Sequence, residues 1–343
     1  MTLVEVLIAV AITSVVMSLA LSVVGAGVRL ARQGEQTVNS NEAARSGMEM
    51  VLRDLRAAGV PGGIWVTDPG GTPFRINSIF TQPGSGTADT GIDDLWMVVP
   101  RPNAMQSNCT SVGSGAVVTV SAPGTLAVNC TAVQLPLLFA GADTLLVSNF
   151  ASAALISGLA FPGGTITFAQ SATPNFSTNP SKGGFQRGDL VFPVDIIRYH
   201  VRLNPMLANG SFPLGRPELI RTRGALAGNP TMAAPFTIPA GAAEQRFPDI
   251  EDLQVAFGTG VAPALTFASA HAVTYTPAAA PLSVRVSMVG ISPRVILDDQ
   301  NKIQEFGPAV VENHTPPSLA FDGYRRSIYR RRIELINMGA VNL

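Results

Sequence analysis

Charged residues are scarce in this sequence, and the few that it has balance each other. Lys, Arg, Asp and Glu make up 13% of the 343 residues, with 23 basic against 23 acidic side chains. A typical soluble domain has about 25%. Affinity for nucleic acid comes mostly from an excess of Lys and Arg, so this composition excludes a general nucleic-acid binder. The hydrophobic share of 46% at zero net charge excludes a disordered chain.

Cysteine and histidine are scarce as well. Two cysteines exclude a disulfide-dense miniprotein and a four-cysteine zinc site. The three histidines, His200, His271 and His314, stand alone in the sequence. The sequence also contains no HExxH, GxSxG or P-loop pattern, which would indicate a metalloprotease, a serine hydrolase or a nucleotide-binding enzyme. We therefore predict a protein that is not an enzyme.

Acidic residues cluster at three places, 93–94, 249–252 and 298–299. Their carboxylates could supply oxygen ligands to calcium, but none of the clusters has the spacing of an EF-hand loop. We expect solvated turns at these positions, no bound cofactor and no metal site.

The apolar residues are concentrated at the N-terminus, where Glu5 is the only charged residue before Arg29. The uncharged stretch 6–28 would be about 35 Å long as a helix, enough to cross a hydrocarbon core of about 30 Å. A cleaved signal peptide is the alternative, but it requires a basic start and a shorter apolar segment. The sequence therefore predicts a membrane-spanning helix over residues 1–28.

The same helix is expected to continue, in amphipathic form, over residues 29–59. An apolar stripe at helical spacing supports this. It consists of Ala44, Met48, Val51, Leu55 and Ala58. Gly59 followed by Pro61 predicts the end of the helix. Several glycines each cost about 1 kcal/mol relative to alanine, so any local unwinding of the helix is expected between Thr13 and Gly27, and whether it occurs stays open at this point.

After Gly59 the chain changes to short β-type runs separated by turn-forming residues. The runs are Arg75–Phe80, Leu95–Val99, Ala116–Ser121, Thr144–Ser148, Thr165–Phe168, Leu190–Leu203, Leu219–Arg223, Leu253–Phe257, Leu282–Val289 and Ser327–Ile336. Residues 84–184 are poor in charge and rich in small residues, which suggests an insertion or a β-subdomain. The predicted class is α+β, with a β-rich head over residues 60–343.

The N-terminus resembles the mature N-terminus of type IV pilins and type II secretion pseudopilins, through Thr2, Leu3, Glu5 and the apolar run that follows. The resemblance extends along the chain, in the family order, to PilW-type minor pilins and J-type pseudopilins. The segments that carry it are 43–59, 249–257, 284–289 and 329–337. Residues 84–184 match nothing in that family.

The resemblance implies a type IV pilin-like fold, with one long N-terminal helix packed on a mostly antiparallel β head, and a structural filament subunit. Met1 would be the N-methylated first residue left by prepilin peptidase, which would recognise Met1, Thr2, Leu3 and Glu5. The subunit would wait in the bacterial inner membrane, beside the assembly platform. It would then join copies of itself or other pilins in an extracellular helical filament.

Other roles stay open at this point. They are a low-abundance minor pilin that primes assembly at the tip and a periplasmic pseudopilin of a type II secretion system. An adhesin or DNA-binding module that is merely anchored by the helix is a further alternative. The relative amount of the chain in sheared filaments would discriminate between these roles.

Glu5 has two interpretations. A first-turn glutamate is stabilised by the helix dipole by about 0.3–1 kcal/mol and could reach the membrane edge. An ionised carboxylate inside hydrocarbon costs about 2.5–3.5 kcal/mol or more and requires a partner. The resemblance implies that the partner is the N-terminal amine of a neighbouring subunit, and we expect Glu5 to act in assembly.

Cys109 and Cys130 would lie in an exported head, where a disulfide between them could contribute roughly 3 kcal/mol. Two buried free thiols are the alternative. The basic run 324–332 is the densest positive segment of the chain. If it is a strand, its arginines divide between two faces, so we expect it to dock on a neighbouring subunit and do not expect nucleic acid as a partner.

Overall fold

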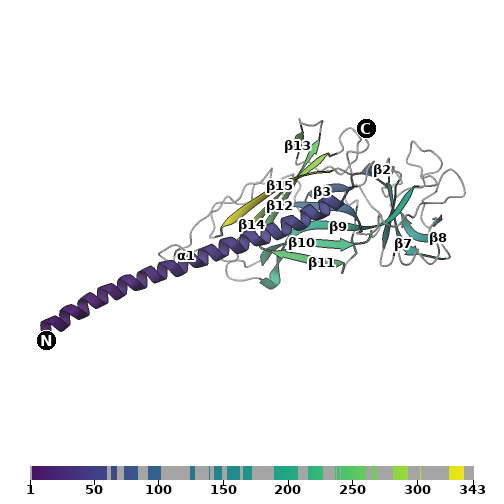
Figure 1. The fold of residues 1–343 in the computed structure, drawn as a ribbon. Helices are drawn as coiled ribbons and strands as arrows, with labels where there is room; N and C mark the ends of the chain where they lie inside the picture. Colours follow the sequence, from purple (N-terminus) through teal and green to yellow (C-terminus); the bar gives the residue numbers. More distant parts are fainter. Residues whose placement is uncertain are drawn as a thin grey trace.

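The computed structural model of the chain has one long helix that projects from a β-rich head (Figure 1). This confirms the expected α+β class, with a head in which all strand pairs among the described residues are antiparallel except that of β1 with β7. The structure describes residues 2–59, 63–67, 73–83, 92–101, 124–127, 139, 143–148, 153–162, 165–171, 189–207, 215–226, 236, 238–239, 241–259, 265–268, 281–292, 302 and 324–335.

Helix α1 spans Leu3–Ala57, 55 residues, which corresponds to about 83 Å. It ends where the sequence predicts, because Ala58 has left the helix and Gly59 has a φ of 111°. Whether α1 unwinds between Thr13 and Gly27 was left open by the sequence, and the helix is continuous there. The Thr13 and Ser14 hydroxyls donate to backbone carbonyls of the preceding helical turn, at 2.7 and 2.8 Å, and so stay inside the helix.

The larger sheet has eleven strands. They are β1 Ile64–Thr67, β2 Pro73–Ile76, β3 Ile79–Pro83, β4 Asp93–Pro100, β5 Gly124–Ala127, β6 Thr144–Ser148, β7 Ala153–Ala160, β8 Thr165–Ser171, β9 Leu190–Asn204, β10 Arg216–Gly224 and β11 Ala243–Pro248. Its main order is β11-β10-β9-β6-β7-β1-β2, and β4 also pairs with β9 and with β3. Strand β8 joins β7 to β5, and among the strands that the structure describes β1 and β7 run parallel to each other. A short 3-10 helix, Pro205–Leu207, follows β9.

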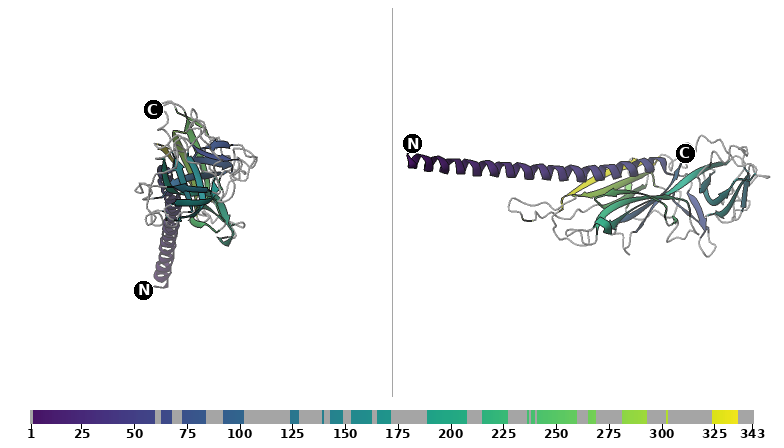
Figure 2. Two further views of the ribbon diagram at one scale, coloured as in Figure 1. Left: turned by 90° about the vertical axis from the view of Figure 1, so that its right-hand side faces the viewer. Right: turned by 90° about the horizontal axis from the view of Figure 1, so that it is seen from below.

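The smaller sheet has four antiparallel strands in the order β13-β12-β14-β15. Their bounds are β12 Ile250–Thr259, β13 Thr266–Ala268, β14 Ser283–Ile291 and β15 Arg326–Glu334. The C-terminal half of α1 packs against β14 and β15 of this sheet and against β4 and β11 of the larger one. Figure 2 shows the helix lying along the head in this region and free of it elsewhere.

The core beneath α1 contains the apolar stripe that the sequence predicts. Ala44, Met48, Val51 and Leu55 are all at most 2% exposed, and Met48, Val51 and Leu55 pack with residues from both sheets. Two glycines allow the close approach. A Cβ at Gly47 would lie 2.7 Å from Ile250 Cδ1. A Cβ at Gly290 on β14 would lie 2.7 Å from the backbone carbonyl oxygen of Ser40 in the helix.

Residues 84–184 contribute to two parts of the head. Strand β4 lies in the region beneath α1, where it pairs with β9 over Leu95–Pro100. Strands β5 to β8 surround a separate apolar core at the far end of the head (Figure 1). Strand β9 reaches both regions, because its first four residues pair with β6 and later ones with β4 and β10.

Most of the predicted runs are strands, with two kinds of difference. The run Arg75–Phe80 is divided between β2 and β3, because the chain bends at Ser78, whose carbonyl accepts a 2.9 Å hydrogen bond from Val98 N–H. Strands β1, β5, β7, β11 and β13 were not predicted. The run Ala116–Ser121 lies outside the described residues.

Candidate functional site

The N-terminal half of α1 is apolar and exposed on every side. Residues 2–24 are all exposed, including large apolar side chains such as Leu7 (61%) and Val23 (72%). The helix is long and apolar enough to cross a membrane, a property that an N-terminal signal sequence can share. A helix that is hydrophobic all round requires burial in lipid or among other helices.

Glu5 lies in the first turn of this exposed segment, where it caps its own helix. Its Oε2 accepts a 2.7 Å hydrogen bond from the backbone N–H of Thr2, the residue at the helix cap. This is one half of a capping box, in which a Glu or Gln at the third helical position satisfies an otherwise unpaired amide. Thr2 and Leu3 precede Glu5 at the helix start, whereas Met1 lies outside the described residues.

The C-terminal half of α1 is joined to the head by a buried polar cluster of Asp54, Tyr199 and Arg221. Asp54 Oδ2 accepts hydrogen bonds from the Tyr199 hydroxyl and from Arg221 Nε, both at 2.6 Å. Asp54 is 4% exposed and Tyr199 is fully buried. Burial, with the neighbouring Asp54 carboxylate, raises the pKa of Tyr199, so the hydroxyl stays protonated as a donor.

The acidic clusters do not form the solvated turns that the sequence predicts where the structure describes them, because Asp93 and Asp252 are buried in strands β4 and β12. Their carboxylates and those of their neighbours have protein partners. Asp93 accepts a 2.7 Å bond from Val255 N–H, Asp94 pairs with Arg198, and Glu251 binds Arg326 through both carboxylate oxygens, at 2.6 and 3.0 Å. Within the described residues no group of three or more His, Cys, Asp or Glu is placed to hold a metal. The pair 298–299 lies outside those residues.

The basic run forms strand β15 at the edge of the smaller sheet, and its arginines divide between the two faces as expected. Tyr329 and Ile333 pack into the core beneath α1, so Arg331 shares their face. Arg330 and Arg332 point to the other face. There Arg330 Nε donates to Ser287 Oγ at 3.2 Å and the Arg332 guanidinium lies 5.4 Å from the ring centre of Phe267.

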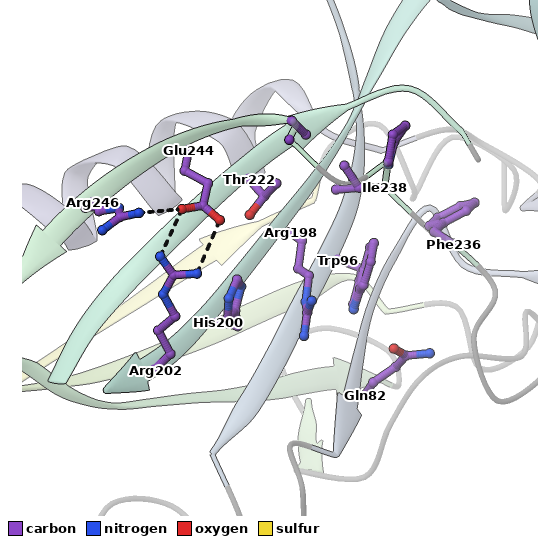
Figure 3. Close-up of a pocket in the computed structure, with 13 residues that line it drawn as sticks. Gln82, Trp96, Arg198, His200, Arg202, Thr222, Phe236, Ile238, Glu244 and Arg246 are labelled. Carbon is purple, nitrogen blue, oxygen red and sulfur yellow. Dashed lines mark hydrogen bonds and ion pairs between the residues drawn. The ribbon is translucent and has the colours of Figure 1, made fainter. Parts of the chain in front are cut away.

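A hollow of about 830 Å³ lies on the face of the larger sheet that is opposite α1 (Figure 3). The sheet register explains this placement, because Leu95, Tyr199 and Leu219 face the helix while their chain neighbours face away. Strands β3, β4, β9, β10 and β11 supply the polar lining, and the segment before β11 supplies apolar residues. The lining residues are Gln82, Trp96, Arg198, His200, Arg202, Thr222, Phe236, Ile238, Pro239, Gly241, Ala242, Glu244 and Arg246.

Burial lowers the pKa of His200 to about 4, and the guanidinium groups of Arg198 and Arg202 add to the effect. His200 is therefore neutral at pH 7.

The other two histidines and both cysteines, Cys109 and Cys130, lie outside the described residues, so the disulfide stays a prediction.

The buried cluster and the hollow were not found from the sequence. One signal for the cluster exists in the sequence. Asp54 lies on the flank of the apolar stripe, seven residues after Gly47, and a solvated charge is not expected there.

No protein-family model, no curated protein and no solved structure matches this chain.

Proposed function

We propose that this chain is a structural subunit of a type IV pilus-like filament and assembles through the exposed half of α1. The single observation that carries the proposal is the division of one unbroken helix. Residues 2–24 are exposed and apolar, whereas the stripe from Ala44 to Leu55 is buried in the head. The helix thus offers one apolar surface that two environments can bury in succession, first lipid and then a bundle of such helices.

The N-terminal pattern supports a pilin over a passive anchor. Thr2, Leu3 and Glu5 occupy the positions that the pilin resemblance requires, and a carboxylate at the start of an apolar helix is a residue that seeks a partner. The present partner of Glu5 is the Thr2 amide. In a filament, the amine of a neighbouring subunit would replace or share this contact.

The proposal is tested by the amount of the chain in filaments sheared from the cells that make it. Quantitative mass spectrometry of that fraction is expected to find this chain as a dominant component. A trace amount would favour a minor pilin at the tip, and absence from sheared material with retention in the periplasm would favour a secretion pseudopilin. Absence from any filament, with the chain confined to the membrane, would contradict the proposal.

A further inference from the structure

Thr37 and Ser40 lie where α1 meets one end of the head. Arg325, which precedes β15, donates to Thr37 Oγ1 at 3.3 Å. Three residues further along the helix, a Cβ at Gly290 would lie 2.7 Å from the Ser40 carbonyl oxygen and 3.7 Å from the carbonyl oxygen of Asp249. We call this part of the head its proximal end, and the exposed half of α1 extends away from it (Figure 1).

A short turn at the proximal end holds a methionine in solvent. Arg216, at the start of β10, forms an ion pair with Asp249 and lies opposite Asn204, the last residue of β9. The Asn204 side chain donates to Glu218 at 3.0 Å and accepts from the Met206 N–H at 3.1 Å. These two bonds fix the 3-10 turn after β9 to the sheet, with Met206 89% exposed.

Leu203 adds a second apolar side chain to this end. Among the described residues of the head, Leu203, Met206 and Ile328 are the large apolar side chains that are exposed. Alternate residues of β9 face α1, and exposure along that row rises from the buried Tyr199, through the half-buried Val201, to Leu203 at 48%. A methionine held almost fully in solvent next to an exposed leucine would gain free energy by burial in an apolar phase.

Basic side chains gather between the apolar run and the proximal end. The uncharged run 6–28 is followed at once by Arg29, then by Arg32 and Glu35, all of them exposed. Arg325, which lies beside this part of the helix, is exposed as well. Arg32 lies about 4.5 Å beyond Arg29 along the helix axis, within a headgroup layer of about 5–8 Å when the run spans the hydrocarbon. Three arginines against one glutamate leave this stretch positive.

The length of the apolar run predicts that α1 tilts in a bilayer. As a helix the run 6–28 is about 35 Å long, about 5 Å more than the hydrocarbon core, and a helix that is too long can adapt by tilting. Ser40 lies about 18 Å beyond the end of the run. The head lies along one side of α1 (Figure 2), so a tilt toward that side brings the proximal end down to the headgroups.

From these observations we propose that the proximal end of the head docks on the surface of a bilayer that contains anionic phospholipid. The guanidinium groups of Arg29, Arg32 and Arg325 bind lipid phosphates. The side chains of Leu203 and Met206 enter the interface between headgroups and acyl chains. Apolar burial combined with attraction to anionic headgroups is the general basis of such interfacial binding. The inference requires α1 to span a membrane, and it does not depend on whether the chain enters a filament.

The test uses the full chain reconstituted in vesicles of phosphatidylcholine brominated near the top of its acyl chains, with or without phosphatidylglycerol. Bromine quenches tryptophan only at short range, so Met206→Trp reports contact of the proximal end with lipid. The matched control is Ala160→Trp, at an exposed position on β7 at the far end of the head. The fluorescence of the unaltered chain, which contains Trp65 and Trp96, is subtracted from both.

With phosphatidylglycerol present, brominated lipid is expected to quench most of the added fluorescence of Met206→Trp and none of that of Ala160→Trp. Removal of phosphatidylglycerol, or an increase in salt, is expected to reduce the quenching about twofold, because the attraction to exposed guanidinium groups is lost or screened. Both substituted positions are exposed, so the denaturation midpoints should equal that of the unaltered chain.

The basic residues are tested by combining Arg29→Gln and Arg32→Gln in the Met206→Trp background. This chain is expected to insert as well as the unaltered one, since the run 6–28 is intact, and to lose most of the effect of phosphatidylglycerol. Arg56→Gln, about 40 Å further along α1, is the control and should retain the effect. Full dependence on phosphatidylglycerol in the double variant would overturn the assignment of phosphate binding to these arginines.

Three results would overturn the docking itself. Equal quenching of Met206→Trp with and without phosphatidylglycerol would remove the role of anionic lipid, and equal quenching of the two reporters would remove the role of the proximal end. Absence of quenching in both lipids would refute the contact altogether. In that last case, a blue shift of the Met206→Trp emission that grows with the density of chains in the vesicle would assign the surface to a second copy.

Discussion

The Tyr199 hydroxyl donates a 2.6 Å hydrogen bond to Asp54 Oδ2 and so joins β9 to the C-terminal part of helix α1 across 145 residues of sequence. Arg221 on β10 binds the same carboxylate oxygen. A carboxylate that is 4% exposed is stabilised in such a position by these two buried partners, with Arg53 lying 3.5 Å from its other oxygen. The cluster therefore fixes the helix to the head at one defined place.

Replacing Asp54 by Asn is expected to destabilise the head by about 3 kcal/mol, because the Arg221 guanidinium loses its charged partner while its side chain stays 13% exposed. Chemical denaturation followed by fluorescence measures this loss. The matched control is Glu49→Gln, which breaks the exposed Arg45–Glu49 pair and should cost less than about 0.5 kcal/mol. Equal effects of the two substitutions would contradict the role of the cluster.

Gly290→Ala is expected to destabilise the packing of α1 by about 1–3 kcal/mol. A Cβ at Gly290 would lie 2.7 Å from the Ser40 carbonyl oxygen and 2.8 Å from Ala44 Cβ, so the helix must shift. Gly34→Ala is the control, since a Cβ there meets nothing within 4 Å and alanine favours the helix. The denaturation midpoint should fall only for Gly290→Ala, and a fall for both would refute the argument from close approach.

Substitutions of Glu5 separate its two interpretations. Glu5→Ala removes both the cap and the charge, whereas Glu5→Gln keeps a side chain that can serve in a capping box. We expect both variants to insert in the membrane and both to enter filaments poorly, because the charge is needed for the neighbouring amine. Immunoblots of membrane and sheared-filament fractions measure this. Normal incorporation of Glu5→Gln would show that the local cap is sufficient.

His200 predicts a loss of stability in acid. Its folded-state pKa of about 4 lies below the ordinary value of 6.5, so between these pH values the unfolded chain binds a proton that the folded chain does not. Stability therefore falls as the pH falls from about 6.5 to 4, by about 2 kcal/mol after allowance for partial exposure. Denaturation midpoints at pH 7 and 4.5 should differ less in His200→Gln than in the unaltered chain. An equal difference in both would contradict this prediction.

The disulfide between Cys109 and Cys130 is tested by intact mass. The chain purified without reductant is expected to gain the mass of two hydrogens on reduction and to react with a thiol alkylating reagent only afterwards. Loss of the bond in a Cys130→Ser variant should reduce the free energy of unfolding by roughly 3 kcal/mol. Alkylation of both thiols without reductant would show that they are free.

Much of α1 could be predicted from local signals, because the apolar run, the stripe from Ala44 and the Gly59 stop each depend on neighbours in sequence. Strand β6 was also predicted with its observed bounds, Thr144–Ser148, since all five residues are buried. Edge strand β11 was missed for the opposite reason: only Phe247 among its residues is buried, so its sequence lacks apolar alternation.

The buried cluster and the hollow could not be predicted in the same way. Asp54, Tyr199 and Arg221 come together only when two strands and a helix pack, and no spacing in the sequence encodes that meeting. The hollow depends equally on the register that places Arg198 opposite Trp96 and Thr222. Both features are products of pairing between distant segments, which local periodicity does not report.

The continuity of α1 also has a mechanical consequence. An axial pull on the exposed half cannot be absorbed by uncoiling at a weak turn, because Leu3–Ala57 forms one unbroken rod. Since the helix lies along the head, the load reaches the head as shear over the whole buried stripe (Figure 2). Many side chains and the Asp54 cluster then resist together, and the head would withstand traction better than if its contacts were peeled apart one at a time.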